Sequence, residues 1–397
     1  DGIVRLTLPV SAFAFGTNTV RMALKDRAGS EIGVQTVDFC RVRKLPRRRV
    51  TFDRYGRTIV DGRKFLPLGM YFGSKFGEAE IAFYTNGTPF NCILPYEPVA
   101  RERLDAMCAR GIRCIVSLKD YMPQSRFSRL KMDTQGDADR VFLHRFEEVR
   151  DHPALLAWYV NDESSVEHLP RLERQYRLVR ERDADHPAFA VLCRLDTIRE
   201  YAGTCDVVGT DPYPVANKQI GIVSDFARET SRAFFGRPMW QVPQSFAWGW
   251  LVKDKGIDPA KYRMPNRAEF RSMSWQHIAN GANGLVYYCY GTMRNNMSPD
   301  EFAEAWTWIC EVSREIEAQF PILLSDPAAN ACGYPAGVSG RAWRKDGFMY
   351  LLVVNETREP RKAELTLPKA YSKATVALDE VPYELKGSHI RIELGGL

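Results

Sequence analysis

Residues 155–163 of the chain read LLAWYVNDE. Six apolar residues, enough for a buried strand, run without a turn residue into an amide and two adjacent carboxylic acids, Asn161, Asp162 and Glu163. Buried strands of this kind are typical of parallel sheets covered by helices, and such sheets carry their sites at the carboxyl ends of the strands. The stretch therefore predicts an α/β fold with polar side chains gathered at one edge of the sheet.

Seven further apolar runs flank this strand, separated by longer amphipathic stretches. They cover residues 65–72, 92–96, 112–118, 189–193, 207–210, 239–243 and 284–290. Two helices carry start signals, Ser298 with Glu301 and Asn266 with Glu269. Eight strand–helix units in about 270 residues match a (β/α)8 TIM barrel. A doubly wound open sheet is the alternative, but the first run is not followed by a glycine-rich phosphate loop.

Three domains are expected along the chain. Residues 1–45 alternate apolar and polar positions, which predicts an N-terminal β-sandwich segment, incomplete because the chain opens within a strand pattern. A basic tract with a proline, residues 43–49, is the expected linker into the catalytic barrel of residues 50–326. Residues 330–397 return to strand alternation and predict a small C-terminal β-sandwich.

Composition and charge restrict the class of protein. The chain has 397 residues, of which 45% are hydrophobic, and this excludes a disordered chain or a coiled coil. A net charge of +6 is too small to indicate nucleic acid, and no run is long enough for a membrane span. The oligomeric state is not predicted.

Sequence motifs exclude several chemistries. The nine cysteines lack CxxC spacing and are expected as buried thiols, with neither disulfides nor a metal site. The six histidines show no HExxH spacing, and the chain has no GxSxG elbow, P-loop or GxGxxG fingerprint. No cofactor is expected, and carboxylate chemistry remains.

The strand ends supply the candidate catalytic acids. Glu163 and Asp162 are adjacent, so their charges repel and one pKa rises enough to supply a general acid. Alternation predicts that Tyr159, Asn161 and Glu163 point one way, while Asp162 depends on how the strand bends. A further acid, Asp211, follows the sixth run.

Aromatic and polar side chains at the same strand ends form the candidate substrate site. Aromatic faces beside amides and carboxyls suit a carbohydrate, whose C–H faces stack on rings while its hydroxyls need hydrogen-bonding partners. Besides Asn161, the candidates are Tyr71, Tyr96, Glu97, Tyr213, Gln241, Gln244, Trp248 and Tyr288.

Two stretches resemble a known family. Residues 50–71 resemble the passage from a β-sandwich into the barrel of many glycoside hydrolases. Residues 158–163 resemble the fourth-strand signature of the retaining clan A barrels, in which a Glu after Asn or Asp is the general acid/base. The resemblance implies a glycoside hydrolase with Glu163 in that role.

The chain departs from this family at the seventh strand. Clan A enzymes place a nucleophilic Glu there, whereas residues 240–246 contain no acid. Three alternatives stay open. In the first, Asp162–Glu163 resembles the pair of the substrate-assisted hexosaminidases, where the Asp orients a 2-acetamido group. In the second, Asp211 or Glu97 is the second carboxylate. In the third, the barrel binds sugar without cleaving it.

The expected function is glycoside hydrolysis of an oligo- or polysaccharide, with Glu163 as general acid and Asp162 beside it. A lyase using Tyr213 and Lys119 is a different class that the sequence leaves open. The flanking β-domains of the resembling family imply an exported protein.

Overall fold

A computed structural model describes residues 6–43, 48–73, 76–97, 99–123, 125, 128, 130–215, 218–252, 262–328 and 332–397. The expected domain limits at residues 45 and 330 lie outside these ranges. The chain divides into two compact units, Asp1–Arg48 and Arg49–Leu397. In the first, η1 (Val10–Ala12) precedes an antiparallel hairpin of β1 (Gly16–Lys25) and β2 (Glu31–Arg41). Asp26 holds its turn, accepting hydrogen bonds from the backbone N–H groups of Ala28 and Ser30.

All eight apolar runs form parallel strands of one sheet. They are β6 (Leu68–Phe72), β7 (Cys92–Pro95), β8 (Arg113–Ser117), β9 (Leu155–Asp162), β10 (Ala188–Leu192), β11 (Val207–Thr210), β12 (Trp240–Gln241) and β13 (Gly284–Tyr287). Each strand pairs with its sequence neighbour, and β13 pairs with β6. A bridge from Val208 to Met239 closes the ring between β11 and β12. The fold is therefore the predicted (β/α)8 barrel, and the doubly wound alternative is wrong.

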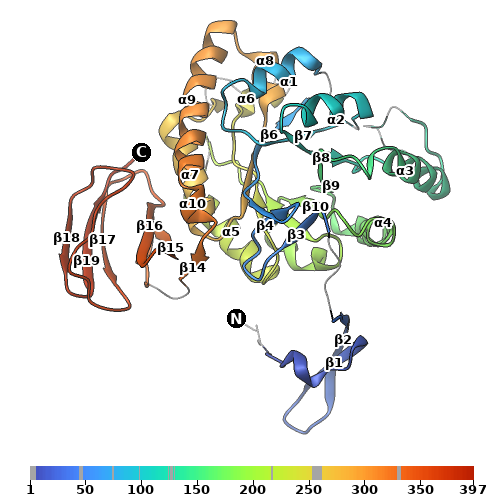
Figure 1. Ribbon diagram of the computed structural model, residues 1–397, viewed down its shortest axis with the longest axis horizontal. Helices are drawn as coiled ribbons and strands as arrows, with labels where there is room; N and C mark the ends of the chain where they lie inside the picture. Colours follow the sequence, from blue (N-terminus) through green and yellow to red (C-terminus); the bar gives the residue numbers. More distant parts are fainter. Residues whose placement is uncertain are drawn as a thin grey trace. The chain divides into compact units, whose positions relative to one another are not determined.

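Helices connect the strands and surround the barrel (Figure 1). In chain order they are α1 (Glu78–Thr85), α2 (Arg101–Cys108), α3 (Gln135–Val149), η2 (Val166–His168), α4 (Leu169–Arg182), η3 (Ile198–Gly203), α5 (Ile222–Ala233), α6 (Trp248–Leu251), α7 (Arg267–Ala279), α8 (Tyr290–Asn296), α9 (Pro299–Ala318) and α10 (Phe320–Leu323). Both predicted capping boxes are present, at the starts of α7 and α9. Between β10 and β11 the described connection is the 3₁₀-helix η3.

Side chains along each strand alternate between two apolar layers. Tyr71 of β6 faces the barrel interior with Leu94 and Trp240, whereas its neighbours Met70 and Phe72 pack outward beneath the helices. This alternation fills the barrel with side chains and leaves the strand ends as the place for a site.

A three-stranded meander covers the floor of the barrel, where the strands begin. Its strands are β3 (Val50–Phe52), β4 (Thr58–Val60) and β5 (Arg63–Phe65), and Val50 and Val60 join the interior layer. Gly56 has φ +74° and lies so close to Asn283 that a Cβ would be 3.0 Å from its side-chain oxygen.

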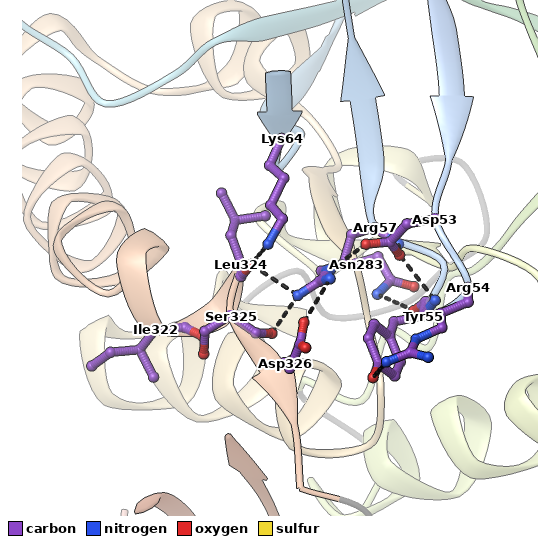
Figure 2. A network of polar contacts seen from close by, with 10 residues as sticks. All are labelled: Asp53, Arg54, Tyr55, Arg57, Lys64, Asn283, Ile322, Leu324, Ser325 and Asp326. Carbon is purple, nitrogen blue, oxygen red and sulfur yellow. Dashed lines mark hydrogen bonds and ion pairs between the residues drawn. The ribbon is translucent and has the colours of Figure 1, made fainter. Parts of the chain in front are cut away.

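Arg57 ties this meander to the end of the barrel segment (Figure 2). Its guanidinium contacts the Asp53 carboxylate at 2.6 Å and the Asp326 carboxylate at 3.0 Å. It also donates to the backbone oxygens of Leu324 and Ser325, at 2.9 and 2.5 Å. Arg57 is only 6% exposed, so these partners replace the water that its charge would otherwise bind.

Two further three-stranded sheets form the C-terminal part. One contains β14 (Asp326–Pro327), β15 (Val338–Lys345) and β16 (Phe348–Asn355), and the other contains β17 (Arg361–Thr366), β18 (Tyr383–Lys386) and β19 (His389–Leu394). Val338 of the first sheet packs with Leu365 and Ile392 of the second, as expected for a small sandwich. Arg358 reaches the buried Glu269 at the start of α7, where Arg263 also binds. No helix of the described residues is both long and apolar enough to cross a membrane.

Arg57→Ala should lower the free energy of unfolding by about 3–5 kcal/mol, because Asp53 loses its buried cation and the Ser325 oxygen loses its donor, while the Leu324 oxygen keeps Lys64. Urea denaturation measures the change. Arg54→Ala is the matched control, since Arg54 is exposed and, among the described residues, bonds Tyr55 alone, and it should cost less than about 0.5 kcal/mol. Equal losses in the two variants would contradict the role given to Arg57.

Candidate active site

Four of the predicted tyrosines gather at the carboxyl ends of the barrel strands. Tyr71 lies 5.5 Å from Tyr96 and 5.4 Å from Tyr288, measured between ring centroids. Tyr213 lies 5.7 Å from Tyr288. The four rings come from the ends of β6, β7, β11 and β13, so the strand ends form one aromatic wall.

A β-bulge decides which side chains of β9 face this wall. Tyr159 pairs with Phe189, but Ala190 pairs with Asn161, so β9 has one extra residue at Val160. After the bulge Asp162 pairs with Val191, whose side chain faces the interior, and Asn161 pairs with Ala190, which packs outward with Leu172. The structure thus turns Asp162 inward and Asn161 outward, in contrast to the simple alternation expected from sequence.

Both carboxylate oxygens of Asp162 have donors. The Tyr159 hydroxyl donates to Oδ1 at 2.5 Å, and the Lys119 ammonium lies 3.3 Å from Oδ2. Burial, with the charge of Asp162 second, raises the pKa of Tyr159 well above its usual range, so this phenol remains a donor. Lys119 also lies 3.1 Å from Asp120 and 4.7 Å from the centre of the Tyr96 ring. Asp162 is therefore fixed within a cluster centred on Lys119.

Asp211 and Glu163 form a second and different carboxyl pair. Asp211 follows β11 and is only 7% exposed, whereas Glu163 follows β9 and is exposed. Burial raises the pKa of Asp211 well above its usual range, followed by a hydrogen bond with the Glu163 carboxyl and by the charges of Glu163 and Asp162. A hydrogen bond from Tyr213 opposes the shift. A raised pKa favours the protonated form of Asp211, as expected for a buried carboxyl beside other acids.

The predicted amides are engaged with the protein itself. The Gln241 side-chain oxygen accepts from the backbone N–H and the hydroxyl of Thr210, both at 2.7 Å. Gln244 binds both backbone polar groups of Val215, in the loop that follows Asp211. These residues hold β11 and its loop in place.

The remaining candidates lie at the expected strand ends. Trp248 begins α6, contacts the Tyr213 ring at 6.0 Å and donates to the Tyr213 backbone oxygen at 3.3 Å. Glu97 is half-buried, two residues beyond β7, and its role stays a prediction.

Three further residues with chemistry-bearing side chains lie at this mouth. Lys119 and Asp120 follow β8, and each alone is a weak signal in the sequence. The contact of Lys119 with Asp162 could not be predicted without knowledge of the bulge. Cys193 follows β10, and burial and then the charges of Glu163 and Asp211 raise its pKa to about 12. Its position at a strand end was the only available signal. Among the residues that the structure describes, no cluster of three or more His, Cys, Asp or Glu side chains is arranged to hold a metal.

Comparison with known proteins gives structural likenesses alone. No family model and no curated protein matches the sequence. Solved structures that resemble the chain include a β-glucuronidase from an uncultured Clostridium species, with 11% identity and a TM-score of 0.45 over 69% of this chain and 56% of that one. A family 2 β-galacturonidase from Eisenbergiella tayi, solved with galacturonate, has 14% identity and a TM-score of 0.47 over 77% and 61%.

A Bacteroides uniformis β-glucuronidase has 10% identity and a TM-score of 0.49 over 96% of this chain and 51% of its own. The chain spans between about half and two thirds of the length of these three proteins. Likenesses of this size do not decide which reaction the chain performs.

Asp211→Asn should remove a pH dependence of stability. The pKa of Asp211 is higher in the folded chain than in the unfolded chain. Above about pH 4 this carboxyl therefore ionises in the unfolded chain first, and the wild type loses stability as the pH rises. Relative to their difference at pH 4, the variant should gain stability over the wild type by pH 7. Urea denaturation across this range measures it.

Two further variants test the cause. Glu163→Gln removes the neighbouring charge and should weaken the pH dependence without abolishing it. Asp225→Asn alters an exposed carboxylate of α5 and should leave the curve parallel to that of the wild type. Parallel curves for Asp211→Asn and the wild type would show that Asp211 does not carry a raised pKa.

Proposed function

We propose that this chain is a glycoside hydrolase whose working groups are the carboxyls of Asp211 and Glu163. The observation that carries the proposal is the buried Asp211 carboxyl at the end of β11, whose pKa is raised by burial and by the neighbouring Glu163, beside the tyrosine rings of the barrel mouth. Cleavage of a glycosidic bond needs this combination, an acid to protonate the leaving oxygen and a carboxylate to stabilise or attack the sugar carbon.

Burial assigns the two roles. Asp211 is buried and its pKa is raised, which suits a general acid, and the exposed Glu163 is then the second carboxyl. This reverses the role that the sequence resemblance implies for Glu163. Tyr71, Tyr96, Tyr213 and Tyr288 supply the ring faces against which a sugar would stack.

The substrate-assisted alternative has less support. That mechanism uses Asp162 to orient a 2-acetamido group, but both oxygens of Asp162 already have donors, Tyr159 and Lys119. Plain hexosides and N-acetylhexosaminides therefore belong in the same assay, and Asp162→Asn should not select against the N-acetyl sugars.

The leaving group should distinguish the two acids. Asp211→Asn lacks the general acid, so it should retain activity on dinitrophenyl glycosides, whose leaving group needs no proton, while alkyl glycosides lose about 10²–10⁴-fold. Glu163→Gln lacks the carboxylate that acts on the carbon, so both substrates should lose alike. Initial rates on a panel of sugars in both anomeric forms measure this.

The opposite pattern, with dinitrophenyl activity surviving in Glu163→Gln, would return the acid role to Glu163. No turnover of any glycoside by the wild type, together with measurable sugar binding, would instead indicate a carbohydrate-binding barrel.

The product should retain the anomeric configuration of the substrate. Glu163 is close enough to Asp211 to raise its pKa, and close carboxyls, about 5–5.5 Å apart, belong to retaining enzymes, whereas an inverting mechanism needs about 6.5–9.5 Å for a water molecule. Proton NMR of the first product formed reports its configuration. An inverted first product would show that a carboxyl other than this pair activates the water.

A further inference from the structure

The backbone of Glu163 has an uncommon conformation. Its φ is +54°, in the left-handed region that residues with a side chain seldom adopt. Its own N–H donates to the backbone oxygen of Val191 in β10 at 3.0 Å. Residues in such conformations persist only where the surrounding structure fixes them.

Every polar group of the next residue, Ser164, takes part in a hydrogen bond. Its N–H donates to the Asn161 side-chain oxygen at 3.1 Å. Its backbone oxygen accepts from the Tyr201 hydroxyl at 2.6 Å, and its own hydroxyl accepts from the Arg171 guanidinium at 3.2 Å. We call these three side chains, Asn161, Arg171 and Tyr201, the Ser164 clamp.

The clamp draws on three separate elements of the fold. Asn161 is available because the bulge at Val160 turns it outward. Arg171 comes from the first turn of α4, and Tyr201 comes from η3, the 3₁₀-helix between β10 and β11. Tyr201 is only 4% exposed, and burial raises its pKa, so its hydroxyl stays protonated and donates.

We propose that Tyr201, Arg171 and Asn161 are positioning residues that act through Ser164 to hold the Glu163 carboxyl against Asp211. The inference rests on the proposed function, in which these two carboxyls do the chemistry. None of the three side chains has to touch the sugar. Their effect is on the position of Glu163, and a reacting group displaced by about 1 Å can lose about 10²-fold in rate.

Tyr201→Phe is the sharpest test, because it removes one hydroxyl and keeps the buried ring. We expect kcat to fall by about 10- to 100-fold while KM stays within about twofold, since the sugar contacts are unchanged. Tyr176→Phe is the matched control. Tyr176 donates its hydroxyl to Asp206 at 2.8 Å, away from Ser164, and its loss should leave kcat unchanged. Equal kcat in wild type and Tyr201→Phe would overturn the proposal.

A double variant tests whether Tyr201 acts through Glu163. In the Glu163→Gln background, Tyr201→Phe should reduce the residual rate by less than twofold, because the group that it positions is already gone. A full additional loss there would overturn the positioning role. Ser164→Ala removes only the contact to Arg171 and should show a smaller loss than Tyr201→Phe.

Crystal structures separate this proposal from the proposed function, because they need no turnover. In Tyr201→Phe the Glu163 carboxyl should move from its wild-type place by more than about 0.5 Å, the tolerance of a productive site, and in Tyr176→Phe it should not move. An unmoved Glu163 would refute the clamp even in an active enzyme. A displaced Glu163 in a protein that cleaves no glycoside would support the clamp and refute the hydrolase assignment.

Discussion

One extra residue in β9 determines the chemistry of the barrel mouth. Without the bulge at Val160, strict alternation would place Asp162 outward beside Ala190 and Leu172, where burial of a charge among apolar side chains is costly. With the bulge, Asp162 forms an ion pair with Lys119 inside the mouth, and the Asn161 side chain accepts a hydrogen bond from the Ser164 N–H outside it. The same shift delivers Glu163 to the rim next to Asp211, so one local irregularity serves three separate contacts.

The two acids of the mouth, half-buried Asp162 and buried Asp211, have different surroundings. Asp162 lies beside the ammonium of Lys119 and a phenol that donates to it, so its negative charge is compensated. Asp211 lies behind Tyr213, and its Oδ1 has no conventional donor among the described residues. Burial, the first cause, raises the pKa of Asp211 and favours its protonated form. Asp162 has Lys119 as a cationic partner, and Asp211 is the more deeply buried of the two.

The architecture was largely predictable from the sequence, because it follows from periodicity and caps. Each apolar run became a strand, and Asn266 and Ser298 begin their helices as their capping boxes indicate. The gathering of Tyr71, Tyr213 and Tyr288 followed from strand order alone.

The details of the site were not predictable in the same way. A bulge leaves no mark in the pattern of residues 155–163, so the orientations of Asn161 and Asp162 could not be read from it. Gln241 and Gln244 stand at strand ends as binding residues do, yet their partners, Thr210 and Val215, come from another part of the chain. Hydrogen-bond partners that are distant in the sequence depend on tertiary packing, which cannot be read from a single sequence.

The joint between α7 and the C-terminal sheets has a consequence for acid tolerance. Although burial alone would raise it, hydrogen bonds from Arg263, the backbone of Asn266 and Arg358 lower the pKa of Glu269 to about 2. A carboxyl with a lowered pKa stabilises the fold above its ordinary value and loses this effect only as the pH falls toward 2. Because the pKa of Asp211 is raised and that of Glu269 is lowered, the mouth titrates at a higher pH than this joint, and the joint stays charged while the mouth responds to pH.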